Sequence, residues 1–421
     1  MSATLAQSQA IIKTRYPDGR LPRANYQLFP FVASIEKEED WDGDVKVVAL
    51  QTENPQGSSA DFPTALGSLQ QGNYQRFQVP RTTHYGIARI QGQALKAAAG
   101  KAGALVDLWK NETDGIAQTE MKCNEIYLWG AGDGVLGTVA SGQTTATITL
   151  ATPEDIVKFD LGMRLQALSA AGFTSVTLRS GYGRVAAIDR KNGTITITAG
   201  NWSDPGNIFG IQVGDVLVRA GDGGGATGSP VVLMGQAGYI CGTGAAGNVS
   251  PGTLFQLPRN ADPTRLAGQV MDATSMPFED AIIEAESLRN LQFLGGELTF
   301  WANPRALAQA KKQAGGKSTY PRTEMKSSVA GLSFSALEFN GDMGPVKIVA
   351  SPFLNRYTAF LLYMPSIKLA SLGPAPQLLD FDTQDMLRVA NDDAYEARFG
   401  QYANSTNNMP VASIQVANYG K

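Results

Sequence analysis

Residues 44–52 read Asp44-Val45-Lys46-Val47-Val48-Ala49-Leu50-Gln51-Thr52, a run that is typical of a β-strand. A second β-rich run extends from Tyr74 to Gln91. The segment between them, residues 54–73, is rich in Gly, Ser, Gln and Pro, and it exceeds the usual hairpin loop of about 2–5 residues. Because an isolated pair of strands is only marginally stable in water, we expect this long hairpin to lie on another surface.

The N-terminal segment, residues 1–38, has short apolar patches interrupted by prolines and a glycine, which predicts an extended arm. Four cations give this arm a local positive charge that can pair with an acidic surface on a neighbour: Lys13, Arg15, Arg20 and Arg23. A solvated tail is the alternative interpretation of the same residues.

The clearest helix candidate runs from Ala94 to about Lys122. Its apolar residues advance by three, four or seven positions, as on one face of a helix: Leu95, Ala98, Ala102, Leu105, Trp109 and Ile116. A helix of this length can brace a flat subunit.

The character of the chain changes between about Val135 and Ala220. Residues 144–150 and 194–198 alternate between apolar and polar with period two, and the second run follows the hairpin-type pair Asn192-Gly193. Short strands at regular spacing without a helix predict a small inserted barrel or sandwich. Residues 221–258 then indicate a loop-rich return.

An α/β segment follows. A helix is expected from Pro277, with an apolar stripe through Leu288, and a second helix from Asn303-Pro304 to about Ala314. Strands are expected at 298–302, 332–339, 346–350, 357–363 and 367–372, with extended chain at 387–402 and 411–417. The fold class is therefore α+β.

Composition limits the possible functions. Of the 421 residues, 17% are charged, below the roughly one quarter of typical soluble domains, and a surface with few charges is often covered. The net charge of −3 argues against tight sequence-specific DNA binding, but it allows a container that encloses nucleic acid. We expect a soluble protein, since neither a signal segment nor a membrane-length apolar run is found. Cys123 and Cys241 have no metal-ligand spacing and predict inert thiols in a reducing compartment.

Signals for catalysis are weak. His84 is the only histidine, and we interpret it as structural. Residues 223–228 and 242–247 match the dinucleotide fingerprint, but each runs into a proline-containing stretch where a helix should begin. The acidic groups Asp392-Asp393 and 36–40 are interpreted as solvated charges. No nucleophile elbow or P-loop occurs, so we expect no enzyme activity, cofactor or metal.

Four stretches resemble those of the major capsid protein of tailed bacteriophages, in the subgroup with a β-rich insertion. They are residues 262–268 (Asp-Pro-Thr-Arg-Leu-Ala-Gly), Asn303-Pro304 after a strand, residues 371–376 (Ser-Leu-Gly-Pro-Ala-Pro), and residues 386–390 followed by 393–396. This family shares its shell fold with encapsulins. The resemblance implies an N-terminal arm (1–41), an extended loop (42–93), a peripheral domain with a spine helix (94–134), an inserted β-barrel (135–222), a return (223–275), an axial α/β domain (276–370) and closing peripheral strands (371–421).

The resemblance also implies a function. Such subunits form pentamers and hexamers that tile an icosahedral shell around double-stranded DNA, within a virion assembled in the host cytoplasm. Scaffolding, portal and decoration proteins are the other implied partners, with no membrane. The loop lies across an adjacent subunit and the arm reaches a further neighbour. The inter-subunit contacts expected from the arm are Lys13, Arg15, Arg20 and Arg23, and those expected from the loop are Phe62, Leu66 and Leu69. Residues 54–73 contain no lysine, which predicts a shell without the lysine-to-asparagine bond of some family members.

Two other functions stay open at the level of sequence. An encapsulin-type compartment would differ in its cargo, and DNA inside native particles would distinguish it from a phage shell. A β-rich carbohydrate-active enzyme would instead be a discrete monomer that loses activity when its carboxylates are mutated.

Overall fold

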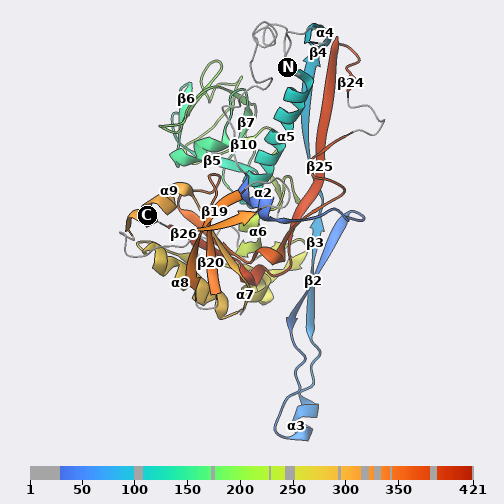
Figure 1. Cartoon of the computed structure of the whole chain (residues 1–421), viewed down its shortest axis with the longest axis vertical. Coiled ribbons are helices and arrows are strands. Elements are labelled where there is room, and N and C mark those ends of the chain that lie inside the picture. The colour runs from blue at the N-terminus through green and yellow to red at the C-terminus, as the bar shows by residue number, and fades with distance from the viewer. Residues whose placement is uncertain are drawn as a thin grey trace.

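The computed structural model describes residues 29–98, 108–171, 176–226, 229–241, 252–292, 295–313, 322–326, 333–341, 344–379 and 386–419. Figure 1 shows a body with a barrel on one side, a long ribbon of strands beside a helix above it, and a thin hairpin that projects from the opposite end. The expected α+β class with an inserted barrel is confirmed.

The hairpin consists of β2 (Val45–Glu53) and β3 (Asn73–Pro80), which pair antiparallel. The predicted second run, Tyr74–Gln91, is two strands. After Pro80 the chain enters β4 (Thr82–Gln91), which leaves the hairpin and pairs along its whole length with β25 (Ala394–Asn407). The structural hairpin is therefore shorter than the expected loop of residues 42–93.

The β4–β25 ribbon belongs to a six-stranded sheet that also contains β1 (Glu36–Glu38), β22 (Ile367–Ser371), β23 (Gln377–Leu378) and β24 (Leu387–Arg388). The spine helix α5 (Leu108–Tyr127) runs beside β4 and β25 (Figure 1). A Cβ at Gly86 of β4 would come within 2.6 Å of Glu120 Oε1, so glycine permits the close approach of strand and helix. The helix continues five residues past the predicted end at Lys122, to Tyr127. Gly92–Ala98 form α4, and residues 99–107 of the predicted helix lie outside the described residues.

The inserted barrel is closed by six strands in the order β10-β5-β6-β9-β8-β7. They are β5 (Val135–Ser141), β6 (Thr147–Leu150), β7 (Arg164–Leu168), β8 (Gly183–Asp189), β9 (Thr194–Ile197) and β10 (Val216–Arg219), with the 3-10 turn η1 (Pro153–Lys158) after β6. Alternation places Ile148 and Ile195 inside, while the hydroxyls of Thr147 and Thr196 hydrogen bond at 2.8 Å. The predicted turn at Gly193 has φ +65°, a conformation that favours glycine.

Within the described residues, the segment expected to form an axial domain contributes strands to an eight-stranded sheet, called the axial sheet below, in the order β13-β16-β26-β21-β17-β20-β19-β18. The strands are β13 (Ile240–Cys241), β16 (Gly268–Asp272), β17 (Leu298–Ala302), β18 (Arg322–Lys326), β19 (Ser333–Gly341), β20 (Gly344–Ala350), β21 (Thr358–Leu362) and β26 (Ile414–Ala417). Both predicted helices form, as α8 (Phe278–Asn290) and α9 (Pro304–Gln313). Shorter elements are α6 (Gln236–Tyr239), α7 (Pro263–Leu266), η2 (Arg259–Ala261), η3 (Met364–Ser366), η4 (Pro410–Ala412) and the small pairs β11 (Gly225–Ala226) with β12 (Ser229–Pro230) and β14 (Thr253–Leu254) with β15 (Leu257–Pro258).

Two strands occupy sheets other than those expected. The C-terminal strand β26, predicted among the closing peripheral strands, lies inside the axial sheet between β16 and β21. All four of its residues are buried, which suits a central strand covered on both faces. Conversely, β22 was expected at the end of the axial domain, yet it pairs with β1 and β25 in the six-stranded sheet that contains the β4–β25 ribbon.

The expected extended arm of residues 1–41 needs correction in its last part. Residues 1–28 lie outside the described residues, but Pro30–Ser34 form the short helix α2, which packs on α5. Phe31 is fully buried against Trp129 and Trp301, at ring-centroid distances of 4.1 and 5.3 Å. Pro30 was interpreted as a breaker, but its missing N–H costs nothing in the first turn of a helix.

Candidate inter-subunit surface

The β2–β3 hairpin is largely exposed to solvent along its outer half. Every second residue of β2 is exposed and none is fully buried, so the ribbon has no core of its own. Tyr74, near the outer end of β3, exposes 69% of its surface. Since a bare two-stranded ribbon is marginally stable in water, this length of the hairpin needs a partner surface.

The tip of the hairpin presents three large apolar side chains. Helix α3 (Phe62–Gly67) lies at the far end of the hairpin (Figure 1), and the Asp61 carboxylate caps it by accepting from Thr64 N. Phe62, Leu66 and Leu69 expose 78%, 58% and 68% of their surface. A cluster of exposed apolar side chains on a projecting element marks a contact surface.

The base of the hairpin, by contrast, is firmly held. Phe77 and Val79 of β3 are buried in a cluster with Trp41, Tyr239 and Phe255, and Gln78 N donates to Phe255 O at 3.1 Å. The hairpin therefore leaves the body in a fixed direction, while its outer part extends beyond the core.

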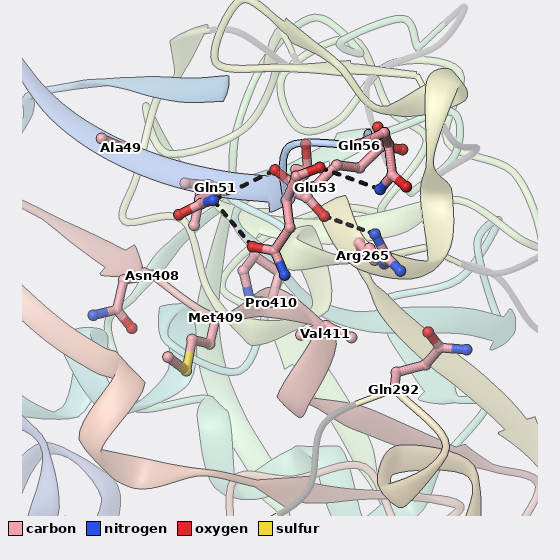
Figure 2. Close-up of a pocket in the computed structure, with 13 residues that line it drawn as sticks. Ala49, Gln51, Glu53, Gln56, Arg265, Gln292, Asn408, Met409, Pro410 and Val411 are labelled. Atoms are coloured by element: carbon pink, nitrogen blue, oxygen red, sulfur yellow. Dashed lines mark hydrogen bonds between the residues drawn. The ribbon is translucent and has the colours of Figure 1, made fainter. Parts of the chain in front are cut away.

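A groove of about 970 Å³ separates the hairpin from the body (Figure 2). Residues 49–54 and Gln56 line one side, and the other side is formed by Arg265, Gln292 and residues 408–411. Arg265 Nη1 crosses the groove and donates to Thr52 O at 2.7 Å. The groove adds a mainly polar concave surface next to the apolar tip.

Of the seven residues predicted to contact other subunits, the structure describes three. Phe62, Leu66 and Leu69 come together at the hairpin tip, whereas Lys13, Arg15, Arg20 and Arg23 lie outside the described residues. Their contact with another subunit stays a prediction in both cases.

His84 sits between two carboxylates rather than facing solvent. Its Nδ1 lies 2.6 Å from Glu120 Oε2 on α5, and its Nε2 lies 3.3 Å from Asp222 Oδ2, where the chain leaves the barrel. Burial opposes the charged imidazolium, but hydrogen bonds to Asp222 and Glu120 outweigh it and raise the pKa of His84 to about 9. Both ring nitrogens are engaged, so His84 has no free nitrogen to act as a base.

The cysteines, the fingerprint matches and the acidic groups noted in the sequence show no arrangement for catalysis among the described residues. Burial raises the pKa of the Cys123 thiol to about 12, which makes it unreactive; the Cys241 side chain lies outside the described residues. In the first fingerprint match, Gly225–Ala226 form strand β11 and open no helix, and residues 242–247 of the second are not described. Glu36 and Glu38 pair with Lys368. Among the described residues, no cluster of three possible metal ligands occurs.

A search of the described helices finds none with the length and apolarity to cross a membrane.

Sequence reasoning missed the partners of His84, because Glu120 and Asp222 are 36 and 138 residues away in the chain. It also missed Glu125, a fully buried carboxylate on α5 that accepts hydrogen bonds from Phe31 N and Val32 N of α2. No local pattern distinguishes Glu120 or Glu125 from the exposed Asp114 on the same helix.

Comparisons with known proteins find similar structures but no similar sequences. No protein-family model and no curated protein matches this sequence. The structure of this chain aligns with the capsid of the native GTA particle, computed with C5 symmetry, with a TM-score of 0.51 and 9% sequence identity. The alignment covers 99% of this chain and 98% of that chain. The capsid asymmetric unit of cyanophage A-1(L) also has a TM-score of 0.51 and 9% identity, covering 100% of this chain and 99% of that one. Over nearly its full length, therefore, this chain has the shell fold of these capsid subunits.

Proposed function

We propose that this chain is a major capsid protein, which self-assembles as pentamers and hexamers into the icosahedral shell around the double-stranded DNA of a tailed bacteriophage. The fold likeness to two capsid subunits over nearly the whole of each chain supports a shell role. The resemblance of short sequence stretches supports the phage shell in particular.

The observation that carries the proposal is the projecting hairpin with its uncovered apolar tip. Phe62, Leu66 and Leu69 are mostly exposed, although burying a leucine or phenylalanine contributes about 1.5–3 kcal/mol. A second copy that received this tip would supply the missing core for the outer hairpin. Repetition of the same contact around a symmetric ring gives a closed assembly.

The protein acts as a structural subunit and has no catalytic role. The only histidine is occupied by two carboxylates, and the thiol of Cys123 is buried. With a net charge of −3, the subunit encloses DNA without binding it tightly or by sequence. Scaffolding, portal and decoration proteins complete the virion, which assembles in the host cytoplasm.

Electron microscopy of the expressed protein tests this proposal. Closed icosahedral particles are the expected result, and nuclease-protected double-stranded DNA is expected in particles purified from the native source. Particles that hold a protein cargo and no DNA would indicate an encapsulin-type compartment. A compact monomer at every concentration and salt would refute the proposal.

A further inference from the structure

The chain enters and leaves the inserted barrel at one narrow neck. The chain enters the barrel near Gly134 and leaves it near Asp222, and a Cβ on Gly134 would lie only 2.1 Å from Asp222 O. A rigid body held at one such point could rotate about it. Further contacts are therefore needed to fix the orientation of the barrel.

One of these contacts joins the barrel to the axial part. The Glu154 carboxylate, from η1 at the rim of the barrel, accepts from Arg305 Nη1 at 2.5 Å and lies 3.4 Å from Arg356 Nη1. Next to it, Asn355 Nδ2 donates to Thr152 Oγ1 at 3.4 Å. The Glu154 side chain is 11% exposed, whereas Arg305 is 67% exposed, so solvent screens the pair from the Arg305 side.

The other contacts join the barrel to the spine helix and to β4. Lys122 Nζ of α5 lies 2.7 Å from Asp160 Oδ2, and the Lys122 side chain is 7% exposed. At the neck, Asp222 faces His84 and accepts from the Tyr127 hydroxyl. In each of the three pairs that cross the boundary, the carboxylate belongs to the insert and the cation to the body. Two cations of the insert also approach these carboxylates, Arg190 at 3.7 Å from Asp160 and Arg219 at 3.8 Å from Asp222.

Apolar side chains of the barrel and of the rest of the chain also form one continuous buried cluster. A cavity of about 380 Å³ lies at this boundary, with Leu136 and Gly137 of β5 on the barrel side and Phe353 and Phe360 on the axial side. The spine and the axial sheet also meet directly, where Trp129 packs on Trp301 at a ring-centroid distance of 5.4 Å. The barrel is thus a second, lateral connection between two parts that already share a joint.

We propose that the inserted barrel is a brace that fixes the angle between the spine helix and the axial sheet, and that Glu154 and Asp160 thereby help to set the curvature of the assembled shell. This inference rests on the proposed function. In a shell of identical subunits, a small change in the angle within each one is repeated at every contact, so it alters the diameter or prevents closure.

A charge swap tests the brace. Glu154→Arg places a third cation beside Arg305 and Arg356, whereas Glu154→Arg with Arg305→Glu restores an opposite-charge pair. Arg305→Gln is the milder variant, because this side chain is 67% exposed and cannot disturb the core. Arg179→Gln is the matched control, since it removes the 2.9 Å pair with Asp215 inside the barrel and leaves the boundary intact.

Two measurements keep the outcomes distinct: particle diameters by electron microscopy and small-angle X-ray scattering of unassembled subunits. For Glu154→Arg we expect no uniform closed shells and a larger maximum dimension of the unassembled subunit. Arg305→Gln should show the same changes more weakly, the charge swap should restore the wild-type values, and the Arg179→Gln control should match the wild type. If Glu154→Arg is insoluble, Arg305→Gln and the swap give the answer. Wild-type diameters and dimensions in every variant would overturn the brace and leave the proposed function standing. Absence of shells from the wild type would refute the proposed function, while scattering would still test the brace.

Discussion

Replacement of Glu125 by glutamine should stabilise the subunit at pH 8. Glu125 is fully buried on α5 and accepts from Phe31 N at 3.1 Å, Val32 N at 2.9 Å and Ser351 Oγ at 3.1 Å. Among the described residues, no salt bridge to it is found within 4.0 Å. Burial raises the pKa of Glu125 from 4.5 to about 7, and these hydrogen bonds offset only part of the rise.

The sign follows from proton binding. Because the folded-state pKa is raised, the folded chain binds more protons than the unfolded chain between pH 4.5 and about 7, so stability falls as the pH rises through this window. At about 1.4 kcal/mol for each pKa unit, the ionised carboxylate costs about 3 kcal/mol once the pH exceeds 7. Glutamine mimics the neutral acid, and its advantage over glutamate should grow by about 2 kcal/mol between pH 5 and pH 8.

Urea unfolding of unassembled subunits, followed by tryptophan fluorescence at pH 5 and pH 8, measures this difference. The test is whether the difference in the free energy of unfolding between Glu125→Gln and the wild type grows with pH, since packing differences between the two side chains do not depend on pH. Glu120→Gln, on the same helix, is the matched comparison with the opposite expected sign. It weakens a charged hydrogen bond to His84 and should lose about 1.5–3 kcal/mol at neutral pH. A wild-type-to-Glu125→Gln difference that stays flat or shrinks from pH 5 to pH 8 would refute the reasoning.

Three further predictions concern the histidine and the hairpin. His84→Gln should lower the free energy of unfolding by about 3 kcal/mol below pH 6.5, and this loss should vanish as the pH rises through about 9. The reason is that a histidine with a raised pKa stabilises the folded state only while its ring is charged. NMR titration of His84 should give a midpoint near 9, and a midpoint near 6.5 would contradict the prediction. Serine at all three tip positions should abolish shell formation, seen by electron microscopy, yet change subunit stability by no more than about 0.5 kcal/mol per site. The three tip residues are Phe62, Leu66 and Leu69, and Leu161→Ser, at a barrel residue of similar exposure, is the control that should assemble normally. Shells formed by the triple variant would exclude the tip as a contact between copies. Reducing, denaturing electrophoresis of assembled particles should show one monomer band, whereas a ladder would reveal covalent links.

Local sequence patterns predicted the elements that depend on neighbouring residues. Alternation at 144–150 and 194–198 identified two barrel strands, and Asn192-Gly193 identified the turn before the second. Asn303-Pro304 marked the start of α9, where the Asn303 side chain accepts from Arg305 N. These signals are reliable because side-chain periodicity and backbone φ preferences act within a few residues.

The sequence alone thus determined the strands of the hairpin, two of the barrel strands and the axial helices. Only the tertiary structure decided that β4 pairs with β25, that β26 lies inside the axial sheet, and that His84 meets Glu120 and Asp222. These pairings join residues far apart in the chain. They form because buried backbone groups and buried charges must find partners in the folded molecule, and that requirement leaves no mark on the neighbouring sequence.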